Sequence, residues 1–200
     1  MNGTPTTFTD WLRARAAFLT TPVARQLADW GVHPNAVTLL GGLCVAGAAT
    51  VLALGHIGWG GLLVLITTSV DALDGRLATL TGQRSRFGAF LDSTVDRLSD
   101  GALLFGLLLH LLALDAELEI ALAFLALLGC VLVSYTRARA EGAGFACKVG
   151  LLTRVPRIVL LGLGLILGLV RPTLILLTAL SWITVGQRVH HVWRQSRREP

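Results

Sequence analysis

The sequence has few charged side chains for its 200 residues and so lacks the polar surface of a water-soluble domain. Charged residues make up 14% of the chain and hydrophobic residues 54%, with a mean hydropathy of +0.69. This composition argues against a disordered tail, a collagen or coiled-coil rod, and a soluble enzyme of ordinary surface. It indicates a membrane protein.

Cysteine and aromatic residues are scarce as well. The three cysteines are an odd number, and Cys44 and Cys130 lie inside apolar runs, which argues against a disulfide framework or a thiolate metal site. The net charge of +5 could suggest nucleic acid, but the basic residues are dispersed and no aromatic-basic binding motif is present. We therefore expect no nucleic-acid partner.

The chain is instead rich in long apolar runs. Several approach the ~20 residues that cross ~30 Å of hydrocarbon, and 22 glycines favour helices packed through small residues over a β-barrel. The sequence predicts an all-α, integral-membrane bundle that forms one domain over residues 1–200. An amphipathic helix at the membrane interface is expected within residues 1–31, and six transmembrane helices within residues 32–200. They are expected at about 35–55, 62–80, 88–114, 120–141, 154–170 and 173–188.

The distribution of cations predicts how the bundle is oriented. Of 17 Lys and Arg residues, Arg171 alone is expected at the end of the bundle where the links at 56–61 and 113–119 lie. The other 16 lie at the opposite face, which the positive-inside rule makes cytoplasmic. We expect a protein of the inner (plasma) membrane with both termini and any chemistry on the cytoplasmic side.

Five aspartates between residues 71 and 100 lie at or beside the ends of two apolar helices. An isolated charged Asp at the centre of a membrane helix costs about 2.5–3.5 kcal/mol, so such a group needs compensation. Asp71 and Asp74 are three residues apart and Asp92 and Asp96 four apart, so each pair shares a helix face. Four hard oxygen ligands without His or Cys suit Mg²⁺, Mn²⁺ or Ca²⁺ rather than zinc. The sequence predicts a phosphate site with two metal ions, and a structural role for Asp100.

This segment resembles the signature of the CDP-alcohol phosphotransferases, DxxDGxxAR followed by GxxxDxxxD. The matching residues are Asp71, Asp74, Gly75, Ala78, Gly88, Asp92 and Asp96. The resemblance extends over nearly the whole chain and includes a PNxxT-like entry at residues 34–38. The chain departs from the family at Thr79, where the family has an Arg that helps to hold the nucleotide phosphates; Arg76 on the same helix is the candidate substitute.

The resemblance implies a site for CDP-diacylglycerol, two Mg²⁺ or Mn²⁺ ions, and a homodimer. Asp96, the last residue of the motif, is the candidate general base. The metal ligands that it implies are Asp71, Asp74, Asp92 and Asp96. The donor-binding residues that it implies are Pro34, Asn35, Thr38, Gly75, Arg76, Ala78, Thr79, Ser85 and Gly88.

Within that family the chain is most similar to the bacterial phosphatidylinositol phosphate synthases. The similarity lies in SYTRARAEG at 134–142, TRVPR at 153–157 and QRVHHVW at 187–193. It implies transfer of a phosphatidyl group from CDP-diacylglycerol to an inositol phosphate, with release of CMP. The pocket for the acceptor phosphate would be formed by Arg137, Arg154, Arg157 and Arg188.

Two alternatives stay open at this level. The same arginines would suit glycerol 3-phosphate, which also offers one hydroxyl and one phosphate. Intramembrane carboxylates also occur in divalent-cation transporters, although the acids here lie toward one face and no inverted repeat is present.

Overall fold

The computed structural model describes residues 21–197, apart from the side chains of residues 69–72. All the regular structure in this part of the chain is helical, as predicted. Residues 21–29 are helical, while most of the predicted interfacial helix lies outside the described residues. The long helices are α2 (Pro34–Ala53), α3 (Ile57–Leu80), α4 (Arg86–Ala113), α5 (Glu117–Gly142), α6 (Arg154–Ile166) and α7 (Val170–Ser196).

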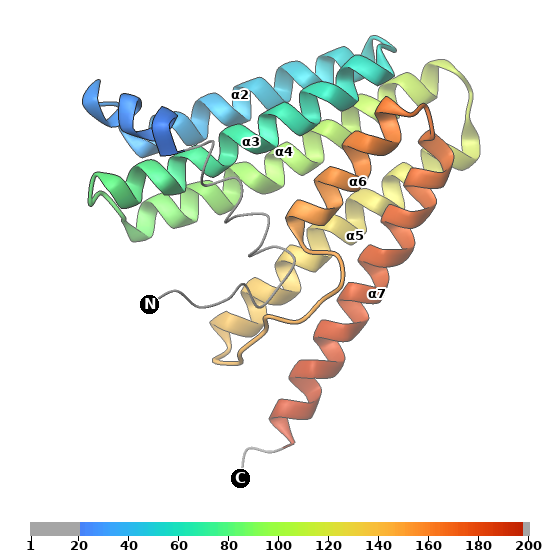
Figure 1. The fold of residues 1–200 in the computed structure, drawn as a ribbon. Coiled ribbons are helices and arrows are strands. Elements are labelled where there is room, and N and C mark those ends of the chain that lie inside the picture. The colour runs from blue at the N-terminus through green and yellow to red at the C-terminus, as the bar shows by residue number, and fades with distance from the viewer. Residues whose placement is uncertain (1–20, 198–200) are drawn as a thin grey trace.

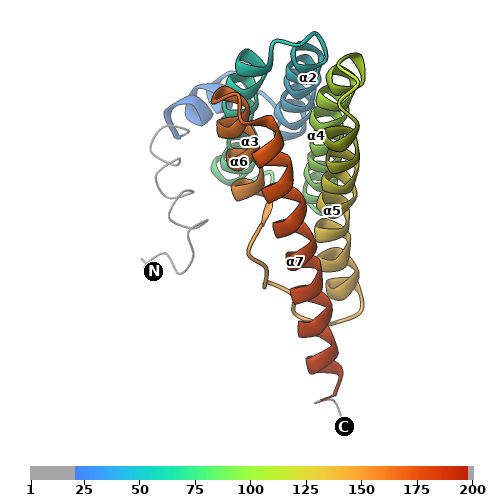
Figure 2. The ribbon, with the colours of Figure 1, turned by 90° about the vertical axis from the view of Figure 1, so that its right-hand side faces the viewer.

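These six helices form a bundle in which the main contacts close a ring. Around the ring the order is α2, α3, α6, α7, α5 and α4, so helices distant in sequence become neighbours. In Figure 1, α2, α3 and α4 lie side by side, and α5 and α7 extend away from them. Figure 2 shows the same bundle from the side, with α3 beside α6 and α4 beside α5. Side chains from all six helices meet inside the ring, among them Leu52, Val64 and Leu107.

The helices follow the predicted segments closely, with differences at their ends. Helix α6 ends at Ile166, where the prediction continued to 170, and α7 runs over Val170–Ser196, where 173–188 was predicted. The glycine-rich link predicted at 56–61 is instead the first turn of α3. A Cβ at Gly61 would lie 2.7 Å from the carbonyl oxygen of Gly162, so the missing side chain lets α3 approach α6. Arg171 and Pro172, predicted as a turn, lie in the first turn of α7, where proline sacrifices no helical hydrogen bond.

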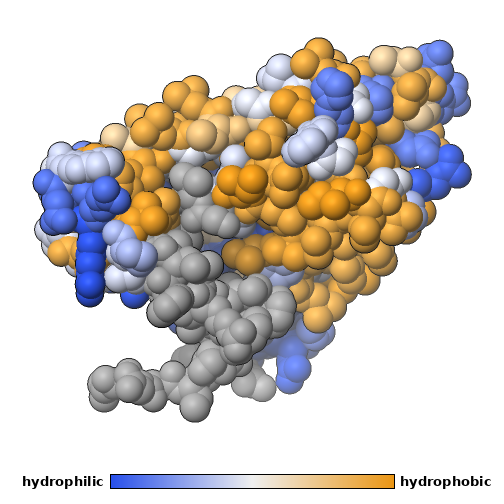
Figure 3. Space-filling view, turned by 45° about the horizontal axis from the view of Figure 1, so that its top comes forward, coloured by the Kyte–Doolittle hydropathy of each residue, from blue (hydrophilic) through white to orange (hydrophobic). Residues whose placement is uncertain are grey.

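The surface and three of the helices are typical of a membrane protein. By length and composition α2, α3 and α5 could each cross a membrane. Figure 3 shows hydrophobic side chains across the middle of one face and hydrophilic ones toward its edges. Helix α6 has 13 residues and is about 20 Å long, which is shorter than the hydrocarbon layer. The count of six crossings therefore stays a prediction.

Candidate active site

The carboxylate of Asp74 is buried near the end of α3 and is held by uncharged donors. Its residue is 8% exposed. The Thr38 hydroxyl, from the second turn of α2, donates to Oδ2 at 2.6 Å, and the backbone N–H of Gly75 donates to Oδ1 at 2.5 Å. Within the described part of the chain Asp74 makes no ion pair. Two hydrogen bonds therefore stabilise this carboxylate without neutralising it.

A pocket of about 270 Å³ opens beside Asp74, between α2, α3 and the start of α4. Asp92, two turns into α4, lines it together with Asp74, so the pocket has two carboxylates on facing helices. The described lining consists of Pro34, Asn35, Thr38, Asp74, Gly75, Ala78, Gln83, Arg84, Ser85, Gly88, Ala89 and Asp92.

Helix caps and a glycine shape the pocket wall. Ser85 is the N-cap of α4, and its hydroxyl accepts the N–H of Gly88 at 2.9 Å. A Cβ at Gly88 would lie 3.1 Å from Ser85 Oγ and 3.2 Å from Asn35 Oδ1, so any side chain would crowd α2 against α4. A Cβ at Gly75 would meet nothing within 4 Å, and its absence leaves the backbone beside Asp74 open to a ligand.

Of the nine predicted donor-binding residues, seven line this pocket: Pro34, Asn35, Thr38, Gly75, Ala78, Ser85 and Gly88. Arg76 and Thr79 are outside the lining. The Arg76 guanidinium donates to the Thr21 hydroxyl at 2.9 and 3.1 Å. Thr79 donates to the carbonyl of Gly75 and accepts from Arg84. The structure thus gathers most of the predicted set but turns Arg76 toward the N-terminal segment.

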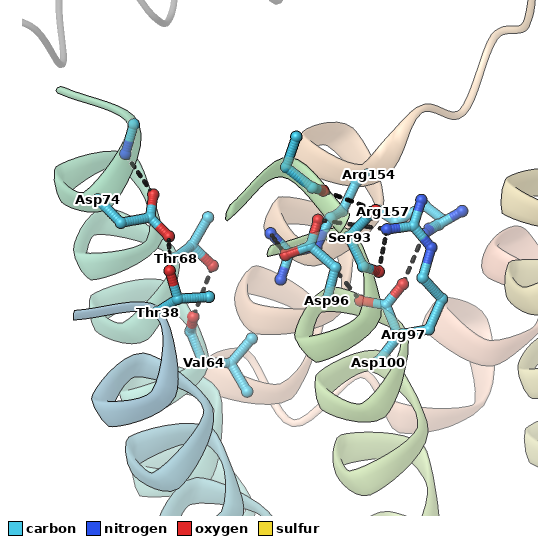
Figure 4. A network of polar contacts seen from close by, with 12 residues as sticks. Thr38, Val64, Thr68, Asp74, Ser93, Asp96, Arg97, Asp100, Arg154 and Arg157 are labelled. Carbon is cyan, nitrogen blue, oxygen red and sulfur yellow. Dashed lines mark hydrogen bonds and ion pairs between the residues drawn. The ribbon is translucent and has the colours of Figure 1, made fainter. Parts of the chain in front are cut away.

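A second group of acids, further along α4, is paired with arginines of α6. Arg154 Nη1 lies 2.8 Å from Asp96 Oδ1, and Arg157 Nη2 lies 2.5 Å from Asp100 Oδ2. Arg154 Nε is 3.8 Å from Asp100 Oδ1. Figure 4 shows these pairs beside the Thr38–Asp74 contact. The pairs cross the inside of the ring from α6 to α4, and Asp100 has the structural role predicted for it.

The predicted set of four metal-ligating aspartates is only partly visible. Asp71 is in α3, three residues before Asp74, but its side chain is outside the described residues. Among the side chains that are described, no three from Asp, Glu, His and Cys are arranged to hold a metal. Asp74 and Asp92 share the pocket, while Asp96 contacts Arg154. The four-ligand site therefore stays a prediction, and the oxygen-only donors on the pocket fit a hard cation.

The four predicted acceptor arginines lie in different surroundings. Arg137 is exposed and pairs with Glu141 at 2.8 Å, and Arg154 is partly buried beside Asp96. Arg157 and Arg188 are each 3% exposed. Arg157 also donates to the carbonyl of Cys130, while Arg188 donates to those of Val133 and Val149.

These last contacts have a structural effect. Arg188 of α7 binds the link between α5 and α6 through the Val149 carbonyl. The Leu152 N–H of the same link donates a hydrogen bond to the Thr184 hydroxyl of α7 at 3.0 Å. This link leads directly into Arg154 at the start of α6. The predicted phosphate-binding roles of Arg157 and Arg188 stay predictions, because both guanidinium groups bind the protein itself.

Sequence reasoning missed two features of this region. Gln83 and Arg84 line the pocket from the link between α3 and α4, and neither is among the predicted donor-binding residues. The pairing of Asp100 with Arg157 was also not foreseen. The available signal was an aspartate within an apolar helix, together with a later helix that has Arg154 and Arg157 in its first turn.

Comparisons with known proteins place the chain in a family. Residues 31–190 match the family model described as CDP-alcohol phosphatidyltransferase. The archaetidylinositol phosphate synthase of Pyrococcus horikoshii is 38% identical over 169 residues, which cover 84% of this chain and 87% of the relative. The phosphatidylinositol phosphate synthase of Mycobacterium tuberculosis is 39% identical, over 90% of this chain and 89% of the relative.

Solved structures agree with this assignment. A crystal structure of Mycobacterium tuberculosis phosphatidylinositol phosphate synthase with CDP-DAG bound superposes with a TM-score of 0.83 at 33% identity, covering 88% of this chain and 94% of that one. Another, in complex with manganese and citrate, has a TM-score of 0.82 at 33% identity and covers 87% and 88%. The chain belongs to the CDP-alcohol phosphatidyltransferase family, and it is therefore an enzyme and not a cation transporter.

Proposed function

We propose that this enzyme transfers a phosphatidyl group from CDP-diacylglycerol to an inositol phosphate and releases CMP. The observation that carries the proposal is the buried Asp74 carboxylate, which makes no ion pair with the described residues and lines a pocket together with Asp92. A diphosphate that binds beside these two carboxylates needs cations between them, because the negative charges repel one another. The relative of known structure has CDP-DAG bound, and the relatives named above are synthases of archaetidylinositol phosphate and phosphatidylinositol phosphate.

Divalent cations are part of the proposal, because a manganese complex exists for the same relative. Asp74, Asp92 and the neighbouring Asp71 and Asp96 would hold them, as two Mg²⁺ or Mn²⁺ ions. The chemistry that such ions supply is neutralisation of the diphosphate and of the charge that develops on the CMP leaving group. The Thr38 hydroxyl fixes the Asp74 carboxylate, so that its orientation is set before a ligand enters.

Asp96 is the proposed general base. It would take the proton of the attacking acceptor hydroxyl as the new P–O bond forms and the bond to CMP breaks. Arg154, 2.8 Å from Asp96, would bind the acceptor phosphate and so hold the hydroxyl near the base. Arg137, exposed on α5, would add positive charge for the same phosphate.

The surroundings of the enzyme complete the proposal. Six crossings would put the pocket and both termini at the cytoplasmic face of the inner (plasma) membrane, where soluble acceptors and CMP can diffuse. The single domain would also include an interfacial helix within residues 1–31. The functional unit would be a homodimer, as the resemblance to the family implies.

The nearest rival keeps the chemistry and uses glycerol 3-phosphate as the acceptor. A parallel assay decides between them: purified enzyme in liposomes with CDP-diacylglycerol and Mg²⁺ or Mn²⁺ receives one acceptor or the other. We expect CMP release and a phosphatidylinositol phosphate product, identified by mass spectrometry, and no turnover in EDTA. Product with glycerol 3-phosphate alone would overturn the proposed acceptor.

A further inference from the structure

The donor pocket contains a cation that the family motif does not provide. Among the described residues that line it, Arg84 is the only Arg or Lys, whereas Asp74 and Asp92 are both acidic. Arg84 comes from the link between α3 and α4, at the mouth of the pocket. Arg84 therefore offers a guanidinium to a diphosphate that binds in this pocket.

The Arg84 side chain is anchored at one edge only. Its Nε donates to the Thr79 hydroxyl at 3.1 Å, and that hydroxyl donates in turn to the Gly75 carbonyl at 2.7 Å. Thr79 thus ties the arginine to the last turns of α3, one turn beyond Asp74. The terminal nitrogens of Arg84 make no hydrogen bond or ion pair with the residues that the structure describes, so they are available to a ligand.

Arg76, the candidate substitute from the sequence, is placed differently. Its guanidinium donates to Thr21 through both Nε and Nη2 and does not line the pocket. To reach a ligand beside Asp74 it would have to give up both hydrogen bonds. Arg84 needs no such rearrangement.

We propose that Arg84, positioned by Thr79, binds a phosphate oxygen of the donor diphosphate. A guanidinium offers two parallel donors to a phosphate, and its fixed charge offsets the repulsion from nearby carboxylates. Thr79 occupies the position at which the family has an arginine. Its hydroxyl accepts a hydrogen bond from Arg84, so it holds an arginine that comes from a later position in the chain. This inference rests on the proposed function, because the ligand is the diphosphate of CDP-diacylglycerol.

The test measures donor binding and steady-state kinetics on the purified full-length enzyme. Arg84→Ala should raise the Kd for CDP-diacylglycerol and the donor KM by about 10- to 100-fold, and should leave the acceptor KM within about twofold. Arg84→Lys should fall between Arg84→Ala and wild type, because lysine keeps the charge but not the paired donors. Adding Thr79→Arg to Arg84→Ala should restore much of the lost affinity.

Arg86→Ala is the matched control. It removes an exposed arginine two residues away that does not line the pocket, and it should change the donor KM by less than about twofold. Unchanged donor binding in Arg84→Ala, or a larger loss in Arg76→Ala, would overturn the inference while leaving the proposed function intact. A folded wild-type enzyme that binds no CDP-diacylglycerol would overturn both.

Discussion

Asp74 and Asp100 are equally buried aspartates in opposite surroundings. Their residues are 8% and 7% exposed. Asp74 accepts hydrogen bonds from a hydroxyl and a backbone amide, whereas Asp100 lies 2.5 Å from the Arg157 guanidinium. Neutral donors solvate a carboxylate without cancelling its charge, and a guanidinium cancels it. Asp74 therefore offers a carboxylate to a bound cation, while Asp100 joins α4 to α6.

Asp96 lies between these two regions and shares features of both. It is one turn from Asp92, which lines the donor pocket, and one turn from Asp100. The side chain of its partner Arg154 is 23% exposed, whereas that of Arg157, the partner of Asp100, is 3% exposed. In the proposed function, cations would bind at the pocket between α2, α3 and the start of α4, the deep α4–α6 pair would give structural support, and the acceptor would react at the boundary between them.

The largest effect is expected for Asp74→Asn. The amide has nearly the same volume and its oxygen can still accept from Thr38, but its NH2 group cannot accept from the Gly75 N–H and it carries no charge for a cation. Transfer should fall by about 10⁴-fold, which corresponds to roughly 5 kcal/mol, while the variant stays folded. CMP release and thermal unfolding measured on the same preparation provide both readouts.

Thr38→Val is the graded control for that variant. It removes the hydroxyl that orients Asp74 but leaves the carboxylate in place, so a loss of about 10- to 100-fold is expected. If Asp74→Asn retained activity within tenfold of wild type, the contrast between the two aspartates would have no functional meaning.

The next effect is on stability and concerns the other side of the comparison. Asp100→Asn leaves the Arg157 guanidinium buried without a counter-charge and should lower the free energy of unfolding by about 3 kcal/mol. Unfolding by denaturant in detergent measures this change. Activity per folded molecule should fall much less than in Asp74→Asn, because the donor pocket does not include Asp100.

A double replacement separates lost pairing from lost packing. Asp100→Leu combined with Arg157→Met removes both charges and fills the space with apolar atoms, so most of the lost stability should return. A double variant less stable than Asp100→Asn would show that the pair itself, and not the orphaned charge, is what holds α4 to α6.

Much of the fold could be predicted because apolar length and polar links follow directly from the membrane environment. The six long helices lie near their expected ranges, and the errors are at ends such as the first turns of α3 and α7. Those ends depend on tertiary contacts, as at Gly61, where the backbone of α6 approaches. A single sequence does not show which helix a glycine will face.

The grouping of the donor residues was predictable from the resemblance to the family. Gly75, Asp92 and most of the predicted donor residues line one pocket. The partners of the arginines were less predictable, since α6 reaches α4 across the ring and not along the chain. Arg84 was missed for a related reason: its place on the pocket depends on the fold of a link, which has no periodicity.

The smallest of these effects is expected for Arg154→Ala, at the boundary between the two regions. Loss of a charge-assisted contact to the acceptor phosphate should raise the acceptor KM by about tenfold, roughly 1.4 kcal/mol, and change the donor KM by less than twofold. Arg171→Ala is the matched control, because it breaks an exposed arginine pair with Glu119 at the other end of the bundle and should alter neither constant. Equal increases in both KM values would place Arg154 on the donor side and remove the boundary that the comparison draws at Asp96.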